Sequence, residues 1–316
     1  MITETEKFIV DPKTGETVKI QAGTKIIPPD EIEYRRGFMR RKKELDLEKY
    51  LENKNLEQYG QFVWHIYKIA EPYNLQLKPA TITRLIYLAT YLDTDGSIVD
   101  YEQPYGKKIY LKKEDISKRM NLNRKTFSRF FKEIQDKKIL MEYKGRWYLS
   151  KKIFDKGSIS GKEIAVLSGK GHYIIRMYKK AIREIYLKSK ITSHPTLGYL
   201  FQIVPFVNRE YNIVCFNPLE TDINKIKCMT VSDYCRAIGY CENSPSKIFN
   251  LLWNLEFTTE RGKECAVTYV SNKSVQKGNF FIYINPYVYY AGSHWDKVEI
   301  LGAFTKEYNN KNTKTK

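Results

Sequence analysis

Between residues 123 and 137 the apolar positions recur with the period of an α-helix. They fall at i, i+3, i+4 and i+7, the spacing of a helix that packs one face against a core. These positions are Phe127, Phe130, Phe131 and Ile134. Asn123 precedes the pattern and is a favourable N-cap, because its side-chain oxygen can accept a hydrogen bond from a free N–H of the first turn. We therefore predict an amphipathic helix over residues 123–137.

Short elements flank this helix in the sequence. A shorter helical pattern over residues 114–120 places Ile116 and Met120 inward, and the upstream "KKIYLKK" predicts a strand. Downstream, a segment that alternates around the turn "KGR" predicts a hairpin. With a further helix near residue 85, the order is helix, strand, helix, tight turn, helix and hairpin. This is the order of a winged helix-turn-helix, in which the second helix of the turn enters the DNA major groove.

The same order of patterns recurs in the second half of the chain. Residues 200–214 match residues 85–99 at an offset of 115, and each segment predicts a helix, a polar turn and a short strand. A later helical stripe matches the first one at an offset of 121. Its apolar positions are Ile248, Leu251, Leu252 and Leu255. We therefore predict an α+β, mostly helical fold with two tandem winged helix-turn-helix domains.

Capping and turn residues complete the second domain. Thr230, followed three residues later by Asp233, is typical of a helix start, and Gly239 is typical of a helix end. Pro245 fits the first position of the next helix. After that helix, residues 264–288 predict two strands around a polar loop, which would form a longer wing than that of the first domain.

These patterns divide the chain into five segments. They are an N-terminal hairpin and basic arm (1–50), a first winged-helix domain (51–155), a connector (156–192), a second winged-helix domain (193–302) and a disordered polar tail (303–316). The hairpin is expected to turn near Gly15. The connector would begin with a loop or short strands and continue as a helix from about Tyr173 to Lys188. The inward residues of that helix would be Ile174, Met177, Tyr178, Ile182 and Ile185.

The basic residues are concentrated in the first domain. The chain of 316 residues carries a net charge of +18, and residues 107–152 hold 16 Lys and Arg against 5 Asp and Glu. A basic cluster of this kind on a helix-turn-helix is the electrostatic pattern of a protein that binds nucleic acid. We expect double-stranded DNA as the partner.

The helix predicted over residues 123–137 carries polar and basic residues opposite its apolar stripe. They are Arg124, Lys125, Ser128, Arg129 and Lys132. With Asn123 at the helix start, they would lie at base edges or phosphates of the major groove, where arginine can pair bidentately with guanine. Lys132 and the hairpin residues Lys144 and Arg146 would fix the register on phosphates.

The second predicted recognition helix is nearly neutral and partly aromatic, and two alternatives are open for it. It could read bases through Ser246, Lys247 and Asn250. It could instead bury Phe249 and Trp253, within the chain or against a second subunit, since aromatic residues are enriched at protein interfaces.

A further basic cluster, "RRGFMRRKK", lies in the N-terminal region. Its six cations are Arg35, Arg36, Arg40, Arg41, Lys42 and Lys43. The cluster could lie along phosphates or enter a minor groove, or it could be the solvated start of a helix.

The sequence contains no recognisable constellation of catalytic residues. The four histidines are isolated, the five cysteines form no CxxC pair, and "GSISGK" lacks the spacing of a phosphate loop. The acidic pair Asp93 and Asp95 fits a turn better than a metal site. We therefore expect no enzymatic activity, no metal and no cofactor, and we expect reduced, mostly buried cysteines.

The sequence gives no sign of a membrane-spanning or secreted chain. No run approaches the roughly 18 apolar residues of a membrane span, and the N-terminus lacks the pattern of a secretory signal. We expect a cytoplasmic location and no membrane partner.

Over about residues 75–292, the doubled pattern resembles the tandem winged-helix proteins of bacterial plasmids and phages. The segment "FFIYINPYVYYAG", residues 280–292, is similar to the C-terminal strand of the RepL-type replication proteins of Gram-positive plasmids. The resemblance implies a replication initiator that binds origin repeats in a bacterial cell or phage-infected host, with other replication proteins as partners. A transcription repressor that binds an inverted repeat as a homodimer is the alternative, and a protein-interaction module is a third. The second predicted recognition helix is nearly neutral, and in this respect the sequence differs from initiators that bind an origin through both winged-helix domains.

Overall fold

The structure is a computed structural model of the 316-residue chain. It describes residues 7–10, 15, 17–20, 33–34, 36–41, 43, 60–69, 77–101, 107–157, 159–240, 245–271, 280–292, 297–298 and 304. The chain divides into two compact units, Met1–Lys54 and Asn55–Lys316. The predicted boundary at residue 50 lies near this division, whereas the other predicted boundaries fall within the second unit.

The first unit contains the predicted hairpin. Strand β1 (Lys7–Val10) pairs antiparallel with β2 (Thr17–Ile20), and Gly15 has a φ of 71° in the connection. Because glycine has no Cβ, it adopts positive φ without steric cost. Helical backbone is found at residues 33–34, 36–41 and 43.

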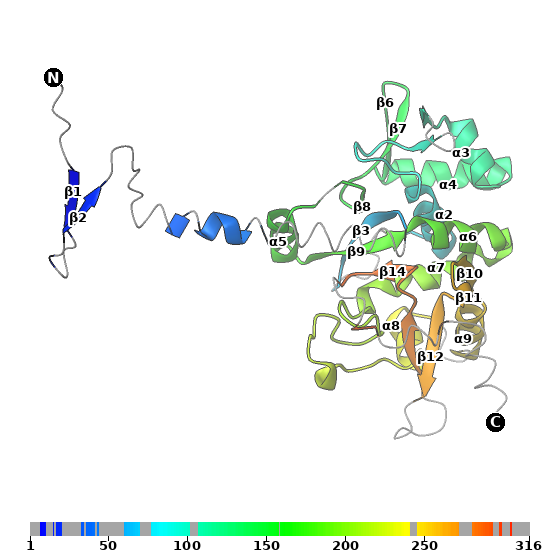
Figure 1. Ribbon diagram of the computed structural model, residues 1–316. Helices are drawn as coiled ribbons and strands as arrows, with labels where there is room; N and C mark the ends of the chain where they lie inside the picture. Colours follow the sequence, from blue (N-terminus) through cyan, green and yellow to red (C-terminus); the bar gives the residue numbers. More distant parts are fainter. Residues whose placement is uncertain are drawn as a thin grey trace. The chain divides into compact units, whose positions relative to one another are not determined.

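The second unit is built around an antiparallel sheet that the sequence did not predict (Figure 1). Its strand order is β14-β9-β3-β8. The strands are β14 (Tyr289–Tyr290), β9 (His172–Tyr178), β3 (Phe62–Lys68) and β8 (Phe154–Asp155). Strands β3 and β9 pair along their whole length, which joins the start of the unit to its middle.

The central sheet corrects the predicted connector helix. Residues 172–178 form β9, and helix α6 (Lys179–Lys188) begins only after them. Every residue from Ile174 to Tyr178 is buried, so the segment shows no one-sided pattern. An apolar run that is buried on both faces cannot be assigned to helix or strand by periodicity alone. In α6, Ile182 and Ile185 are buried as predicted.

The first part of the connector also differs from the prediction of a loop or short strands. It forms helix α5 (Gly161–Gly169). Ser160 caps this helix by accepting a hydrogen bond from the Glu163 N–H, and the Glu163 carboxylate accepts one from the Ser160 N–H. This capping box satisfies two backbone donors at the start of the helix.

The elements predicted for the first domain are present in the predicted order. They are α2 (Pro79–Ala89), β4 (Val99–Tyr101), β5 (Lys108–Tyr110), α3 (Lys113–Arg119), α4 (Arg124–Asp136), β6 (Leu140–Tyr143) and β7 (Arg146–Leu149). Strand β4 pairs with β5, and β6 pairs with β7, in both cases antiparallel. These are small two-stranded sheets within an α+β fold.

The later part of the unit contains the predicted helices and an additional hairpin. The predicted helices are α7 (His194–Gln202), α8 (Val231–Ala237) and α9 (Pro245–Trp253). Three short 3-10 helices, η1 (Ile191–Ser193), η2 (Val204–Phe206) and η3 (Ile223–Lys225), were not predicted. The strands are β10 (Glu256–Thr259), β11 (Gly262–Cys265), β12 (Val267–Ser271) and β13 (Phe280–Ile284). Strands β12 and β13 pair as predicted for the longer wing, whereas the β10–β11 hairpin was not predicted. Phe304, which the sequence placed in the polar tail, is fully buried.

The repeat seen in the sequence has a counterpart in the backbone hydrogen bonds. After α2, the Leu111 N–H donates to the Ile98 carbonyl, and the Ile98 N–H donates to the Trp147 carbonyl. The matching donors and acceptors in the second half are Met229 N–H to Val214 C=O and Val214 N–H to Ile282 C=O. Ile98 therefore connects the segment before α3 to β7, and Val214 connects the segment before α8 to β13 in the same way.

The two halves share one hydrophobic core, and α2 packs against α7 within it. In Figure 1, α3, α4 and the β6–β7 hairpin lie on one side of this central pair, and α8, α9 and β12 lie on the other. The Thr83 hydroxyl of α2 donates to the buried His194 carbonyl of α7 at 2.7 Å. Gly198 of α7 lies at the closest approach, where a Cβ would be 2.6 Å from the Pro79 carbonyl carbon.

We predict that Gly198→Ala destabilises the fold. The added methyl group would meet backbone atoms of Pro79, which cannot rotate away, so the two helices would have to separate. Overpacking of this kind costs about 1–3 kcal/mol of unfolding free energy. Urea unfolding measures the loss, and Gly169→Ala is the control because no atom lies within 4 Å of its added Cβ. Equal stability of the two variants would contradict close packing of α2 on α7.

Candidate nucleic-acid interface

The end of α3 and the start of α4 are joined by a tight turn. Asn121 has a φ of 47° in this turn, and asparagine tolerates the left-handed region better than most residues. Asn123 caps α4 as predicted, because its Oδ1 accepts a hydrogen bond from the Thr126 N–H at 2.8 Å. The residues of the predicted apolar stripe are all buried. They are Phe127, Phe130, Phe131 and Ile134.

Burial of this stripe fixes which face of α4 meets solvent. The five residues predicted to contact DNA are all exposed on that face. They are Arg124, Lys125, Ser128, Arg129 and Lys132. Within the described residues, no ion pair involves any of the four cations in this group, which we call the α4 basic face. The neighbouring Glu133 points elsewhere on the helix, since its carboxylate accepts a hydrogen bond from the Thr81 hydroxyl at 2.7 Å.

The β6–β7 hairpin places two more predicted residues in solvent. Lys144 and Gly145 have φ values of 50° and 71°, as the two-residue hairpin turn requires. Lys144 and Arg146 are both exposed. The Arg146 guanidinium lies 3.8 Å from the centre of the Tyr110 ring of β5, a cation–π contact that holds the Arg146 side chain against this ring.

Tyr110 was not among the residues predicted from the sequence. It supports Arg146 and also lies 4.8 Å from the Lys108 ammonium. The alternation in "KKIYLKK" marks Tyr110 as a strand residue, but its contact with Arg146 depends on the fold, which brings the β6–β7 hairpin to β5.

The second predicted recognition helix buries part of its aromatic surface within the chain. The Phe249 ring stacks on Tyr269 of β12 with ring centres 4.1 Å apart, and Trp253 stacks on the same ring at 5.5 Å. The Tyr269 hydroxyl donates to the Phe249 carbonyl at 3.2 Å. Both aromatic side chains are half-buried, and Tyr269 of the same chain covers part of each ring.

The polar residues of α9 remain on its solvent side. Ser246, Lys247 and Asn250 are exposed, while Ile248 and Leu252 are buried. A hollow of about 460 Å³ lies beside this face. Its lining residues are Ser189, Ser193, Leu197, Lys247, Asn250, Leu251, Asn254 and Leu255. The exposed polar face of α9 carries one cation, whereas the α4 basic face carries four.

We predict that Trp253→Arg lowers the melting temperature and leaves the molecular mass in solution unchanged. The variant loses the stacking on Tyr269 and Phe249, and such aromatic contacts contribute about 0.5–1.5 kcal/mol each beyond their buried area. Thermal melts and light scattering measure the two quantities. A fall in mass at unchanged stability would instead place Trp253 between two copies of the chain.

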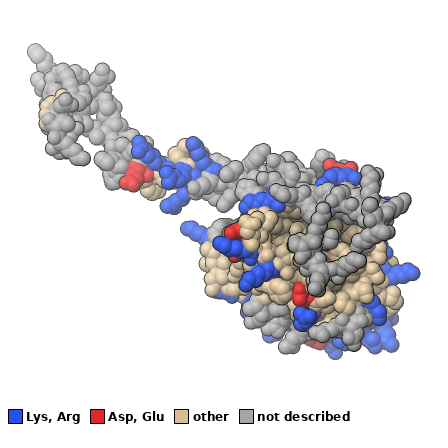
Figure 2. All heavy atoms as spheres, turned by 90° about the horizontal axis from the view of Figure 1, so that it is seen from below, with Lys and Arg blue, Asp and Glu red and all other residues tan. Residues whose placement is uncertain are grey.

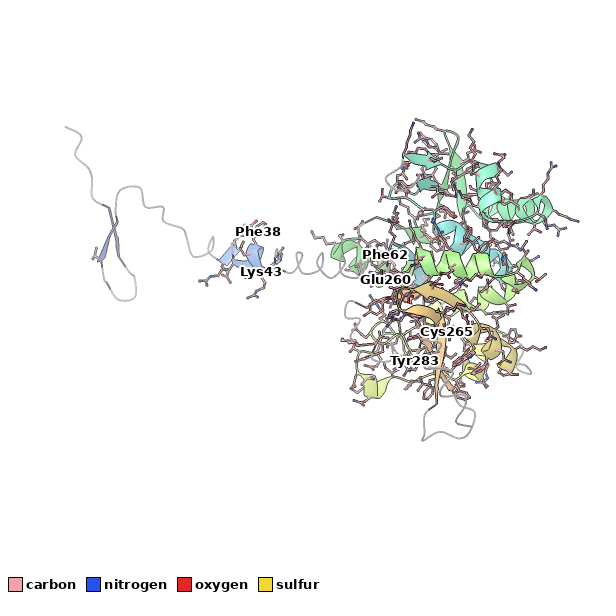
Figure 3. All side chains as sticks on the ribbon, turned by 45° about the vertical axis from the view of Figure 1, so that its right-hand side comes forward. Phe38, Lys43, Phe62, Glu260, Cys265 and Tyr283 are labelled. Atoms are coloured by element: carbon pink, nitrogen blue, oxygen red, sulfur yellow. The ribbon has the colours of Figure 1, made fainter. Side chains whose placement is uncertain are left out.

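The N-terminal basic cluster lies in the first unit. Arg36, Arg40, Arg41 and Lys43 have helical backbone and are exposed, whereas Arg35 and Lys42 lie outside the described residues. Figure 2 shows basic side chains gathered on this short helical segment. Phe38, labelled with Lys43 in Figure 3, is 60% exposed on the same segment. The described part of the segment is therefore helical, and its four described cations are exposed, which fits either of the two interpretations.

The acidic pair Asp93 and Asp95 forms a turn, as predicted. The Asp93 N–H donates to the Ser97 carbonyl, and the Asp93 carboxylate pairs with Lys108 at 2.7 Å and Lys156 at 3.1 Å. Burial acts to raise the pKa of the Asp93 carboxyl, but the hydrogen bonds from these and neighbouring groups hold it below its ordinary value. Among the described residues, no group of three or more His, Cys, Asp and Glu side chains could hold a metal ion.

Two of the isolated histidines are inside the protein. His65 is 2% exposed and His194 is 1% exposed. Burial lowers the pKa of His65 to about 3, and burial with the charge of Arg84 lowers the pKa of His194 to about 4. Both imidazoles are therefore neutral at physiological pH.

Neither a protein-family model, nor a curated protein, nor a solved structure matches this chain. In the part of the chain that the structure describes, no helix combines the length and the apolar character needed to cross a membrane.

Proposed function

We propose that this protein binds double-stranded DNA through two winged-helix modules, with α4 as the principal recognition helix. In the first module, α2, α3 and α4 are followed by the β6–β7 wing. In the second module, α7, α8 and α9 are followed by the β12–β13 wing. The order of the elements and the repeated backbone hydrogen bonds support the division into two modules.

The single observation that carries the proposal is the α4 basic face. Its four cations are exposed and lie opposite the buried aromatic stripe, on the helix that follows a tight turn. Phosphate contacts supply most of the affinity of such proteins, whereas hydrogen bonds to base edges supply the specificity. Arg124 and Arg129 are our candidates for base contacts, and Lys144 and Arg146 on the wing are our candidates for phosphate contacts.

A replication initiator of the plasmid or phage type is the role we favour. The two modules share one core in a single chain, so one molecule could contact two adjacent DNA segments without forming a dimer. The stacking of Phe249 and Trp253 on Tyr269 also covers part of the aromatic surface of α9 within the chain, which leaves less of it for self-association as a dimeric repressor. The polar face of α9 is left exposed, and Ser246, Lys247 and Asn250 could contact the second segment.

Footprinting of the full chain on the DNA that flanks its gene tests this proposal. An initiator is expected to protect several direct repeats, and a repressor is expected to protect one inverted repeat in the promoter. Protection of no site, at salt concentrations where binding is detectable, would leave non-specific binding or a protein-interaction role.

A further inference from the structure

Two cysteines that are separated along the chain face each other in the second half of the Asn55–Lys316 unit. Cys215 follows the turn after α7, and Cys228 stands two residues before Thr230, the N-cap of α8. The two residues form an antiparallel β-bridge. Both are free thiols in the structure.

The hydrogen bonds around this bridge define its geometry. The Met229 N–H donates to the Val214 carbonyl, and the Phe216 N–H donates to the Lys227 carbonyl, each at 2.9 Å. These bonds flank the cysteines, which therefore occupy a non-hydrogen-bonded position of the antiparallel pair. Cα atoms in such a position lie about 4.5 Å apart with their side chains close together. Disulfides join Cα atoms that are about 4.4–6.8 Å apart, so little backbone movement would be needed.

The two thiols differ in their access to solvent. Cys215 is 0% exposed, whereas Cys228 is only half-buried. An oxidant would therefore reach the Cys228 sulfur first, with Cys215 behind it as the second thiol. The other buried described cysteines, Cys235 and Cys265, are not part of this bridge.

We propose that Cys215 and Cys228 are a redox modification site, at which a peroxide converts the two thiols into a reversible intramolecular disulfide. In the first step, the Cys228 thiolate attacks one oxygen of hydrogen peroxide, and the O–O bond breaks. The products are the Cys228 sulfenic acid and a hydroxide, which takes up the thiol proton and becomes water. In the second step, the Cys215 sulfur attacks the Cys228 sulfur, the S–O bond breaks, and the leaving hydroxide takes the Cys215 proton as a second water. The two thiols lose two electrons in total, and the peroxide gains them.

The reaction should be slow at neutral pH and faster at alkaline pH. Burial raises the pKa of Cys215 to about 12 and raises the pKa of Cys228 above its ordinary value. The thiolate is the reactive form of cysteine, so the rate should rise with the thiolate fraction.

The disulfide would close a ring around the loop 216–227. This loop is already held by the Asn217 side chain, which donates to the Lys225 carbonyl and accepts from the Lys227 N–H. It carries three exposed apolar residues, Phe216, Leu219 and Ile223. The bond would join the two ends of this loop just before α8, and it would stabilise the folded state by restricting the unfolded chain.

The test is oxidation of the full chain with hydrogen peroxide at mildly alkaline pH, followed by intact-mass measurement and non-reducing peptide mapping. We expect the loss of two hydrogen atoms, a peptide pair linked through Cys215 and Cys228, and full reversal by dithiothreitol. Cys215→Ser and Cys228→Ser should both abolish the product, whereas Cys235→Ser, a buried cysteine on α8, should keep it. The oxidised chain should melt several degrees above the reduced chain.

Three results would overturn the proposal. They are oxidation of Cys228 that ends at a sulfur acid without a cross-link, a cross-link that persists in Cys215→Ser, and no reaction at either thiol while the unfolded chain reacts. A Cys215→Ser variant that melts like the wild type in the reduced state would show that loss of the product is not a folding defect.

Discussion

Raising the salt concentration about fourfold, from roughly 50 to roughly 200 mM, should weaken binding to duplex DNA by about three orders of magnitude. Each neutralised phosphate contributes about −0.9 to the slope of log K against log salt, and contact with about six phosphates gives a slope of about −5. The α4 basic face and the β6–β7 hairpin residues Lys144 and Arg146 provide six exposed cations for these contacts. Fluorescence anisotropy of a labelled duplex over a salt series measures the slope.

Variants locate the cations that produce this slope. Lys125→Ala combined with Lys132→Ala should reduce its magnitude by about 2, about 1 for each lost phosphate contact. Lys225→Ala is the control, since Lys225 is exposed on η3 but its ammonium pairs with the carboxylate of Asp222, the N-cap of this helix. A slope near zero, or an equal change in the control, would mean that the α4 basic face does not contact phosphates.

Lowering the pH from 7 to 5 should reduce the free energy of unfolding, because two buried histidines must be protonated in the unfolded chain but not in the folded one. The pKa values of His65 and His194 are lowered to about 3 and about 4 by burial, whereas an unfolded histidine titrates near 6.5. Since the folded pKa is the lower one, the unfolded chain binds more protons below pH 6.5. The full stability is therefore present above about pH 6.5 and is lost as the pH falls towards the folded values. Each histidine should cost about 1.4 kcal/mol per pH unit in this window, or about 4 kcal/mol for both at pH 5.

Urea unfolding between pH 7 and pH 5 measures this loss. His65→Phe replaces one imidazole by an apolar ring among Phe154 and Tyr289, and it should remove about half of the pH dependence. A stability that stays flat from pH 7 to pH 5 would show that the buried imidazoles are protonated without cost.

The helix and hairpin of the first module could be predicted because their signals are local. Asn123 caps the helix, the aromatic stripe gives its period, and Lys144 with Gly145 defines the turn. The central sheet could not be predicted in this way. Its strands β3 and β9 pair residues that lie far apart in the sequence, such as Trp64 and Arg176. A local sequence pattern cannot predict which distant segment a strand will pair with.

The candidate site shows the same division between local and long-range information. The exposed face of α4 follows directly from the helical period. The packing of Phe249 and Trp253 inside the chain could not be predicted from the helical period. It depends on Tyr269, which β12 brings alongside α9. The β10–β11 hairpin shifts that wing along the chain relative to the first module, so the matching stripes alone could not locate Tyr269.

The binding of the footprinted duplex by single-residue variants tests recognition through α4 most directly. Arg124→Ala and Arg129→Ala should each weaken specific binding by about 1–3 kcal/mol and relax specificity at one base pair. Lys144→Ala should weaken binding to all sequences alike, since a phosphate contact carries no sequence information. If both arginine variants bind as tightly as the wild type while Asn250→Ala abolishes specific binding, α9 is the recognition helix and the assignment to α4 is wrong.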